Sequence, residues 1–523
     1  MKRDFAALGK THFDLLVCGG GIYGAWTAYD AALRGLKVAL VEQGDWAGAT
    51  SSASSKLIHG GLRYLETYDF KLVKKALTER GMLLQAAPHR VWPLRFGVPV
   101  YADSRMFRLQ LKAGLVLYDL LARIPAAGMR HRYFNRSKFA QRFSALSSAG
   151  LRGGFTYADA QTDDARMVLE LVAGAMKAGA VCVNYCKLVA LNEINGTVSG
   201  ATVQNMGGGE TLNIRARTVV NTTGQWLTAN EESRAWCRLS KGVHLILPQM
   251  LGDEALLLTA QPDGRVFFMI PWYGLTLVGT TDTDYRGDIG HVAVEPADID
   301  YLLREVNHYF NTHLTARDVI GSYAGLRVMR QSDAAHPSVV SRDWELKRGS
   351  NGEFYSVGGK LTSAREDAAV IVDAVCTELG VDVPCSTKDR AFPWAPDDFF
   401  TWSAALIEQA LKLGVDAECG KWLIRRYGKR AEEILRDVER DAALANRIVP
   451  SLPLIYADLL FCAREEMVVH LDDLLRRRMP LLILAKQTEQ ELHRIAQAVA
   501  AVLGWNDARV KQEVLIVANR QIT

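Results

Sequence analysis

The sequence predicts an α/β fold that carries an inserted antiparallel sheet and ends in an all-helical domain. The first observation is a strand, a glycine-rich turn, a helix and a second strand close to the N-terminus. The second is that strand and helix patterns interleave up to about residue 385, whereas the pattern is helical after Phe392 and Pro393, for example over residues 422–428 and 466–475. We therefore expect one domain over residues 1–385, in which a mixed sheet is inserted, and a helical domain over residues 386–523.

The N-terminal strand and turn carry a nucleotide-binding motif. Residues 13–18 are mostly apolar and lead into Gly19, Gly21 and Gly24 at GxGxxG spacing. Gly19 is expected to allow the tight turn, Gly21 the approach of the backbone to phosphate, and Gly24 the packing of helix on strand. The second strand ends in Glu42, whose carboxylate suits ribose hydroxyls and repels a 2′-phosphate. The unit predicts a Rossmann-like domain for FAD or NAD rather than for NADP.

The next segment distinguishes between these two cofactors. Residues 44–66 are too long and too rich in small hydroxyl residues for an ordinary strand-to-helix connection. Small residues let a backbone run against a flat ring system and a diphosphate. The segment therefore favours a flavin.

Residues 49–66 resemble the signature of the FAD-dependent glycerol-3-phosphate dehydrogenases. Further motifs similar to those of this family follow in the same order over roughly the whole chain, at residues 219–226, 241–244, 277–282, 325–327, 341–343 and 358–362. The resemblance implies FAD as cofactor and oxidation of sn-glycerol 3-phosphate to dihydroxyacetone phosphate. It also identifies the C-terminal segment as the family's small helical domain.

The motifs and the resemblance together give a set of expected cofactor contacts. These are Gly19, Gly21, Gly24, Glu42, Thr50, Ser51, Ser55, Lys56, His59, Gly61, Leu62, Gly224, Gly359, Lys360, Leu361 and Thr362. The glycines Gly358 and Gly359 allow close approach to a flavin, and Lys360 would then place an ammonium beside the ring.

Three positions depart from the family pattern. Gln225 stands where a proline is usual, Val328 and Met329 where proline and leucine are usual, and residues 363–366 where Thr-Tyr-Arg-Lys is typical. The motif cores are intact. The departures leave open a second reading, in which the substrate is another polyol phosphate.

Substrate binding requires cations for a phosphate dianion, and forked guanidinium groups suit it best. Arg327 and Arg342 lie in motifs that in the resembling family cover the substrate, and Arg63 and Tyr64 resemble residues that line its pocket. Arginines at such spacing would otherwise be surface charges. We expect these four side chains to contact the substrate.

The reaction also needs a base for the hydroxyl proton. Histidine titrates near neutrality, and the candidates are His244, in an apolar strand, and His59, beside Gly60 and Gly61. A lone histidine on such a strand is as often a satisfied core residue. We expect His244 to be the base, with His59, Arg327 and Lys360 as further catalytic residues.

The electron acceptor is expected to be external. The sequence has no second GxGxxG unit, no cysteine cluster for iron and sulfur, and no CxxCH for haem. The resemblance implies a membrane quinone. Residues 105–123 read as a basic amphipathic helix, which suits a membrane interface, although a core helix with a solvated end is as common.

Composition restricts the remaining possibilities. The chain has 523 residues, 49% of them hydrophobic and 23% charged, and its net charge of +4 is too small to predict nucleic-acid binding. Its eight cysteines are scattered, so we expect reduced thiols and no metal site. Neither a signal peptide nor a membrane span is expected.

These features predict a cytoplasmic enzyme attached peripherally to the inner face of the cell membrane, with a homodimer as a possible assembly. The alternative from another class is a flavin-binding scaffold without turnover. Retention of Arg327, Arg342 and Lys360 argues against it.

Overall fold

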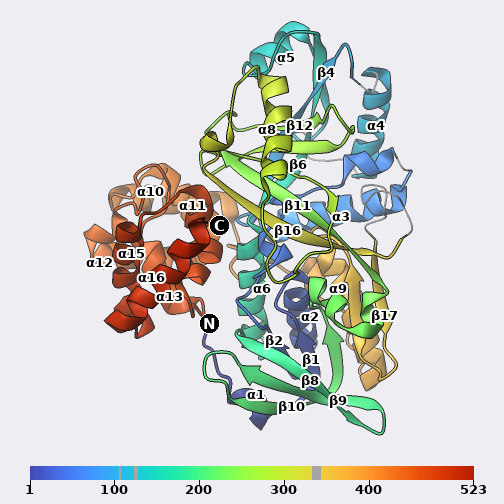
Figure 1. Ribbon diagram of the computed structural model, residues 1–523, viewed down its shortest axis with the longest axis vertical. Helices are drawn as coiled ribbons and strands as arrows, with labels where there is room; N and C mark the ends of the chain where they lie inside the picture. The colour runs from blue at the N-terminus through green and yellow to red at the C-terminus, as the bar shows by residue number, and fades with distance from the viewer. Residues whose placement is uncertain (67, 105–107, 123–127, 333–342, 523) are drawn as a thin grey trace.

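The protein, as a computed structural model, is described over residues 1–66, 68–104, 108–122, 128–332 and 343–522. Two sheets with their covering helices form an elongated body, and the C-terminal helices pack against one side of it (Figure 1). Both chain ends lie near the junction between the body and this C-terminal domain.

The first sheet is the Rossmann-like one. Its strands run in the order β17 (Trp344–Arg348), β18 (Phe354–Gly358), β10 (Thr211–Asn221), β1 (His12–Cys18), β2 (Val38–Val41) and β7 (Val181–Val183). The pairs from β18 to β7 are parallel. Strand β1 is apolar because α2 (Ile22–Leu33), α6 (Asp164–Lys177) and α9 (Ala364–Leu379) cover the sheet.

A β-hairpin extends this sheet beyond β10. It consists of β8 (Cys186–Ile194) and β9 (Thr197–Asn205), joined by Asn195 and Gly196. Both turn residues have positive φ, 52° and 74°, which a two-residue hairpin turn of type I′ requires. The Asn-Gly pair in the sequence predicts this turn, and the structure confirms it.

The second sheet forms the inserted layer. Its strands run in the order β15 (Thr283–Asp284), β11 (Cys237–Leu247), β14 (Leu275–Gly279), β13 (Val266–Trp272), β12 (Ala255–Thr259), β4 (Val91–Tyr101), β6 (Leu151–Thr162) and β3 (Leu57–Ile58), with β16 (Gly321–Arg330) on β11 and β5 (Arg132–Asn135) on β6. The pairing is antiparallel except between β12 and β4. The helices of this region are α3 (Phe70–Ala86), α4 (Arg108–Leu121), α5 (Arg136–Arg142) and α8 (Pro296–Phe310).

The C-terminal domain is helical, as predicted. It contains α10 (Phe399–Lys412), α11 (Ala417–Tyr427), α12 (Ala431–Arg440), α13 (Tyr456–Glu465), the π-helix η9 (Asp473–Arg478), α14 (Leu481–Leu484), α15 (Glu489–Leu503) and α16 (Asp507–Ile522). The short α-helices α1 (Ala7–Lys10) and α7 (Glu231–Arg234) precede this domain in the chain. The α/β fold with its inserted sheet and helical end is therefore confirmed.

Buried ion pairs hold the C-terminal domain on the body. The Arg166 guanidinium, on α6, donates to the Glu466 carboxylate at 2.5 and 2.8 Å, and both side chains are fully buried. Arg90 donates to the Arg426 carbonyl at 2.8 Å. Across the part of the chain that the structure describes, none of the helices combines the length and hydropathy needed to span a bilayer.

Candidate active site

A cavity of about 1300 Å³ lies where the first sheet, the second sheet and the C-terminal domain meet. The first sheet contributes the glycine turn after β1 and the end of β2. The second sheet contributes residues of β11 and β16, including His244 and Arg327. The C-terminal domain contributes residues of η9 and α16, so three parts of the chain enclose one site.

The glycine turn has no room for side chains. Gly19 has φ of 109°, and a Cβ there would lie 2.7 Å from the Thr222 carbonyl oxygen. A Cβ on Gly24 would lie 1.8 Å from the Gly19 carbonyl oxygen, which is a clash between helix and turn. Gly21 is the residue before α2, and it lines the cavity. The N-terminus of α2 therefore opens onto the cavity, where its amides suit a diphosphate.

The end of β2 presents a fixed carboxylate. Glu42 accepts hydrogen bonds from the Gly20 and Gly44 amides at 2.6 and 2.8 Å. Burial raises the pKa of Glu42, and the two amides oppose that shift. The carboxylate lines the cavity, a position that suits the predicted ribose contact.

The small-residue segment forms a second wall. It includes two short 3₁₀ helices, η1 (Thr50–Ser52) and η2 (Leu62–Leu65). The Thr50 hydroxyl donates to the Leu326 carbonyl at 2.6 Å, which ties this wall to β16. All of the predicted cofactor residues line the cavity except Gly24, which packs α2 on the turn, and Lys56.

Lys56 does not occupy the place that the sequence suggests. Its ammonium donates to the Asp164 carboxylate at 2.5 Å and to the Ser52 carbonyl at 2.8 Å, and its side chain is 3% exposed. The lysine thus holds η1 on α6 from behind. A sequence motif gives the residue type but not the side of the loop on which it lies.

Lys360 and Arg63 meet at the ring of Tyr64. The Lys360 Nζ lies 3.8 Å from the ring centroid, and the Arg63 Cζ lies 5.0 Å from it. Gly359 has φ of 102°, and a Cβ there would collide with the Tyr23 hydroxyl, which accepts from the Lys360 amide at 3.0 Å. The structure thus brings together three residues that the sequence assigns to substrate and catalysis.

His244 lies in β11 with its ring stacked on Tyr323, the centroids 4.9 Å apart. Its Nε2 lies 2.8 Å from the Ser55 hydroxyl, and its buried Nδ1 has no hydrogen-bond partner among the described residues. Burial, together with the charges of Arg327 and Lys56, lowers the pKa of His244 well below its usual value. The imidazole is therefore neutral near pH 7 and able to accept a proton.

His59 has a different environment. Its amide donates to the Thr362 hydroxyl at 3.2 Å, and that hydroxyl donates back to the His59 carbonyl at 3.3 Å. Its ring lies edge-on to Phe268. His59 thus joins the small-residue segment to the start of α9, which suits a cofactor contact more than proton transfer.

Arg327 lies on the cavity wall in β16. Its Nη2 donates to the Thr280 hydroxyl at 2.7 Å, and its Nη1 donates to the Thr281 carbonyl at 3.2 Å and lies 3.5 Å from the Asp282 carboxylate. These contacts fix the orientation of the guanidinium. Arg342 lies outside the described residues.

Sequence reasoning missed the residues that the C-terminal domain, the loop after β2 and the connection from β7 to β8 bring to the cavity. They are Asp45, Tyr185, Asp472, Arg476, Arg477, Lys486 and Arg520. The sequence does contain a sign of these residues: three arginines at 476–478 follow Asp472 and Asp473 within an otherwise apolar stretch. Such a charge cluster in a buried segment requires partners elsewhere in the fold.

The parallel sheet, the two-walled cradle and the second sheet that covers it define a flavin-dependent oxidoreductase. Glycines that exclude any side chain, a carboxylate at the end of β2 and small residues on the second wall fit FAD. Residues 14–359 match the FAD dependent oxidoreductase family, and residues 385–510 match the C-terminal domain of alpha-glycerophosphate oxidase.

Similar proteins include the glycerol-3-phosphate dehydrogenase of Synechocystis sp., 35% identical over 98% of this chain and 97% of that protein. The aerobic glycerol-3-phosphate dehydrogenase of Bacillus subtilis is 33% identical over 91% of this chain and 89% of that protein. The solved structure of the glycerol-3-phosphate dehydrogenase from Bacillus halodurans complexed with FAD has a TM-score of 0.80 at 29% identity, over 98% of this chain and 95% of that one. This chain belongs to the glycerol-3-phosphate dehydrogenase family of FAD-dependent oxidoreductases.

Proposed function

We propose that this protein uses FAD to oxidise sn-glycerol 3-phosphate to dihydroxyacetone phosphate and passes the electrons to a membrane quinone. The observation that carries this proposal is the meeting of His244, Arg327, Lys360, Arg63 and Tyr64 on the same cavity as the FAD cradle. A flavoprotein scaffold without turnover would have no need of this set.

Each residue then has a task. Arg327 and Arg63 bind the substrate phosphate, together with Arg342, because guanidinium forks match phosphate oxygens. His244 takes the hydroxyl proton at Nε2, next to Ser55. Lys360, whose ammonium lies over the Tyr64 ring, would supply positive charge that stabilises reduced FAD. When bound, FAD supplies the acceptor for the hydride that leaves the carbinol carbon.

The test is anaerobic mixing of the purified yellow protein with glycerol 3-phosphate and a panel of other polyol phosphates, while flavin absorbance is followed. Rapid bleaching by glycerol 3-phosphate alone is expected. Bleaching by none of them would eliminate the dehydrogenase and leave the scaffold.

A second candidate keeps the chemistry and changes the substrate to another polyol phosphate. It is favoured by Gln225, Val328 and Met329, which depart from the family pattern and line the cavity. In the same experiment, preferential bleaching by a longer polyol phosphate would favour this candidate.

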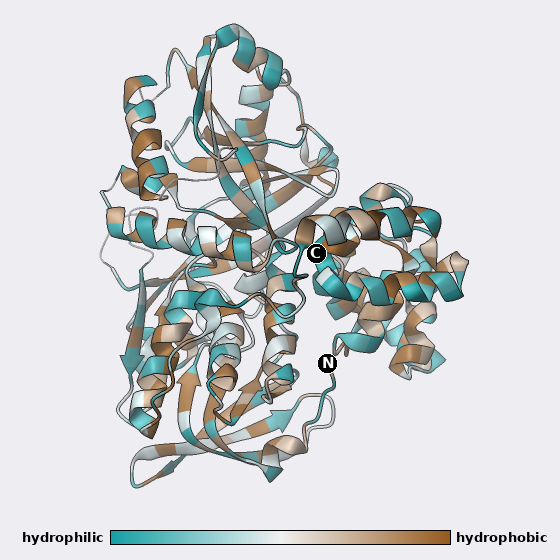
Figure 2. Cartoon of the chain, turned by 180° about the vertical axis from the view of Figure 1, so that it is seen from behind, coloured by the Kyte–Doolittle hydropathy of each residue, from teal (hydrophilic) through white to brown (hydrophobic). Residues whose placement is uncertain are grey.

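We also propose that α4 attaches the protein to the inner face of the cell membrane, where it meets the quinone. Leu109, Val116 and Leu120 lie on one face of α4 and are 74%, 39% and 70% exposed. This helix stands at the edge of the body (Figure 2), and Arg108 and Lys112 at its start suit anionic lipid. The predicted helix also includes residues 105–107 and 123, which lie outside the described residues.

Membrane attachment is tested by cosedimentation with vesicles of phosphatidylglycerol and phosphatidylcholine. The double variant Leu109→Glu with Leu120→Glu is expected to remain in the supernatant. Val370→Glu, at a residue 45% exposed on α9, is the matched control and should sediment like the parent. Equal sedimentation of both variants would refute the role of α4.

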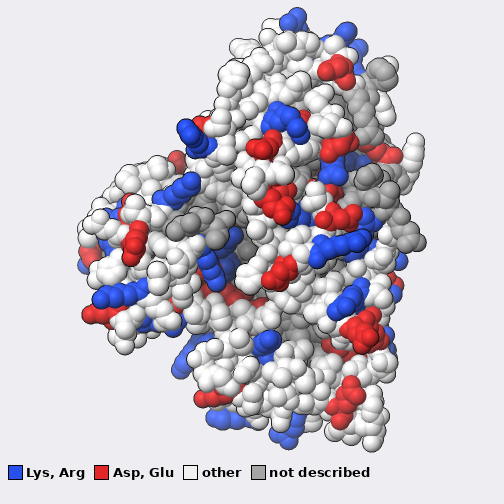
Figure 3. All heavy atoms as spheres, viewed as in Figure 1, with Lys and Arg blue, Asp and Glu red and all other residues white. Residues whose placement is uncertain are grey.

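Three further expectations remain proposals. The first is that the chain divides into two domains between residues 385 and 386, and the second is that the protein is cytoplasmic. The third is that the protein forms a homodimer through its C-terminal helices, where Phe400, Leu411 and Leu515 are exposed. Light scattering at several concentrations measures the assembly. On the face shown in Figure 3, positive and negative side chains are interspersed.

A further inference from the structure

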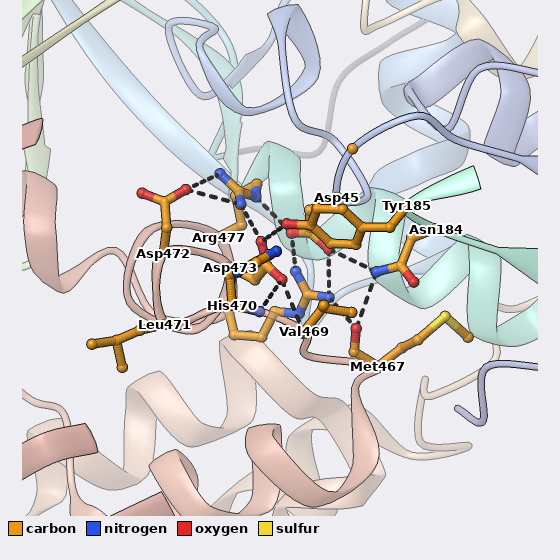
Figure 4. Close-up of polar contacts among 12 residues, drawn as sticks. Asp45, Asn184, Tyr185, Met467, Val469, His470, Leu471, Asp472, Asp473 and Arg477 are labelled. Atoms are coloured by element: carbon orange, nitrogen blue, oxygen red, sulfur yellow. Dashed lines mark hydrogen bonds and ion pairs between the residues drawn. The ribbon is translucent and has the colours of Figure 1, made fainter. Parts of the chain in front are cut away.

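A buried cluster of charges joins the loop after β2 to η9 of the C-terminal domain (Figure 4). We call it the Asp45 cluster, and its members are Asp45, Asn184, Tyr185, Asp472, Asp473, Arg477 and Arg478. Sequence positions more than 400 residues apart meet in it, and the proposed reaction assigns no task to any of them.

Asp45 is at the centre of this cluster. Its carboxylate accepts from Arg477 Nε at 2.6 Å and from Arg478 Nη2 at 2.8 Å, and Arg478 Nη1 donates to it as well. Asn184 Nδ2 adds a contact at 3.3 Å. Asp45 and Arg478 are both buried, so this carboxylate is held mainly by side chains of the C-terminal domain.

The cluster is continuous with the cofactor cradle. Tyr185 donates its amide to the Gly44 carbonyl at 2.8 Å and its hydroxyl to Asp473 at 2.5 Å. Gly44 donates to Glu42, the predicted ribose ligand, and Ala47 donates to the Gly20 carbonyl at 3.0 Å. Through Asp45 and its neighbours along the chain, two hydrogen bonds therefore connect η9 to the ribose carboxylate, and two connect it to the glycine turn.

The composition of the cluster points to positioning rather than to stability alone. Taking charges out of water is costly, and well-packed apolar groups often stabilise a contact equally well. Buried ion pairs add a defined geometry, because the paired N–H donors of a guanidinium bind a carboxylate in only a few orientations. In this case the oriented group is the loop that follows Glu42.

We propose that the Asp45 cluster is a positioning device through which docking of the C-terminal domain sets the shape of residues 42–48 and thereby the affinity for the adenosine end of FAD. Linkage makes the effect reciprocal, so bound FAD strengthens the docking of η9. The inference requires that the protein bind FAD and is independent of which polyol phosphate it oxidises.

The test is a fluorescence titration of the apoprotein with FAD. Arg478→Gln is the informative variant, because Arg478 is fully buried and does not line the cavity. We expect its Kd for FAD to rise by about tenfold or more, within the usual range of coupling between two sites. With FAD saturating, KM for the substrate should stay within about twofold, since η9 acts on the cofactor loop.

Arg90→Gln is the matched control. It removes the hydrogen bonds from Arg90, which is equally buried, to the Arg425 and Arg426 carbonyls; these bonds also join the two domains but touch no member of the Asp45 cluster. Its Kd for FAD should stay within about twofold of the parent. An equal loss of FAD affinity in both variants would show that any buried contact between the domains has this effect, which contradicts a specific role for the cluster. An unchanged Kd in Arg478→Gln would also overturn the proposal.

A double variant tests whether Arg478 acts through Asp45. The effects of Asp45→Asn and Arg478→Gln on the Kd should not add, because both remove the same contact, and full additivity would contradict the proposal. If Arg478→Gln does not fold, Asp473→Asn replaces it, since Asp473 holds both Tyr185 and Arg477 from outside the cavity. For this variant a Kd equal to that of the parent would again overturn the inference.

Discussion

His244 combines a buried, neutral imidazole with a hydroxyl partner. Its lowered pKa follows from burial and from the positive charges of Arg327 and Lys56, which disfavour the imidazolium. At neutral pH the imidazole is already unprotonated, so it need not lose a proton before it can act as a base. Its stacking on Tyr323 fixes the plane of the ring, so that Nε2 faces the hydroxyl of Ser55 and, we propose, that of the substrate.

Replacing His244 by Gln should slow flavin reduction by roughly 10²-fold or more, the usual contribution of a positioned base. Stopped-flow mixing with glycerol 3-phosphate measures this rate. FAD binding should persist, because the cradle is intact. His59→Ala is the companion variant, and a larger loss of rate there than in His244→Gln would move the base to His59.

Arg327→Lys retains the charge and removes the fork. The parent guanidinium is oriented by Thr280 and Thr281, and a lysine ammonium cannot reproduce two parallel donors. We expect KM for glycerol 3-phosphate to rise about tenfold or more, with a smaller change in kcat. Steady-state assays with an artificial acceptor measure both constants, and an unchanged KM would remove Arg327 from phosphate binding.

Site residues that lie close together in the sequence are easier to predict than residues that meet from distant parts of the chain. The glycine turn, Glu42 and residues 50–62 lie within one short stretch, so a local motif was sufficient to predict them. Arg477 reaches Asp45 across 432 positions, and no local pattern encodes that meeting. Lys56 shows the other limit, because only tertiary packing decides that it pairs with Asp164.

At the scale of elements, α2 depends on one glycine inside it. Gly24 lies in the first turns of the helix, where any Cβ would collide with the Gly19 carbonyl. The clash involves backbone, which cannot move without opening the turn that faces the diphosphate. The helix and the glycine turn are therefore one unit.

Gly24→Ala should abolish FAD binding and lower the melting temperature. Gly81→Ala is the matched control, because Gly81 also lies inside a helix, α3, and has open space around it. That change should stabilise the protein by up to about 1 kcal/mol, through the better helix propensity of alanine. Thermal unfolding with flavin fluorescence follows both properties, and FAD binding by Gly24→Ala would contradict the argument.

Helix boundaries in the C-terminal domain show how far the hydrophobic pattern of the sequence alone predicts secondary structure. Residues 422–428 read as helix, and α11 confirms this up to Tyr427. Residues 466–475 also read as helical, and the structure confirms this only from Leu471 onward: α13 ends at Glu465, residues 466–470 form no helix, and the π-helix begins at Asp473. The reason is local, because the Asp473 carboxylate accepts the amides of Val469 and His470 and so stabilises the intervening turn.

For the whole molecule, buried ion pairs between domains make stability depend on pH. Burial alone would raise the pKa of Glu466, but Arg166 outweighs it and lowers the pKa from 4.5 to about 2. A carboxyl whose pKa is depressed on folding stabilises the protein above its unfolded pKa, and this contribution is lost as the pH falls from 4.5 to 2. The shift corresponds to about 3 kcal/mol.

Glu466→Gln should therefore lower the free energy of unfolding at pH 7. The difference from the parent should shrink as the pH falls from 4.5 towards 2, because the parent carboxyl becomes protonated there. Urea unfolding at a series of pH values measures this difference. A difference that stays constant over this range would show that the ion pair contributes nothing through its charge.

The order of strands in the first sheet has a consequence for how the protein is made. Strand β1 lies between β2, which follows it closely in the sequence, and β10. Strand β10 in turn pairs with β18, which begins roughly 340 residues after β1. At about 5 to 20 residues per second, a ribosome needs roughly 20 to 70 seconds to deliver β18 after β1. Since η9 comes later still, the flavin pocket is closed only after nearly the whole chain has been synthesised, and until β18 arrives the β10 edge of the sheet lacks this parallel partner.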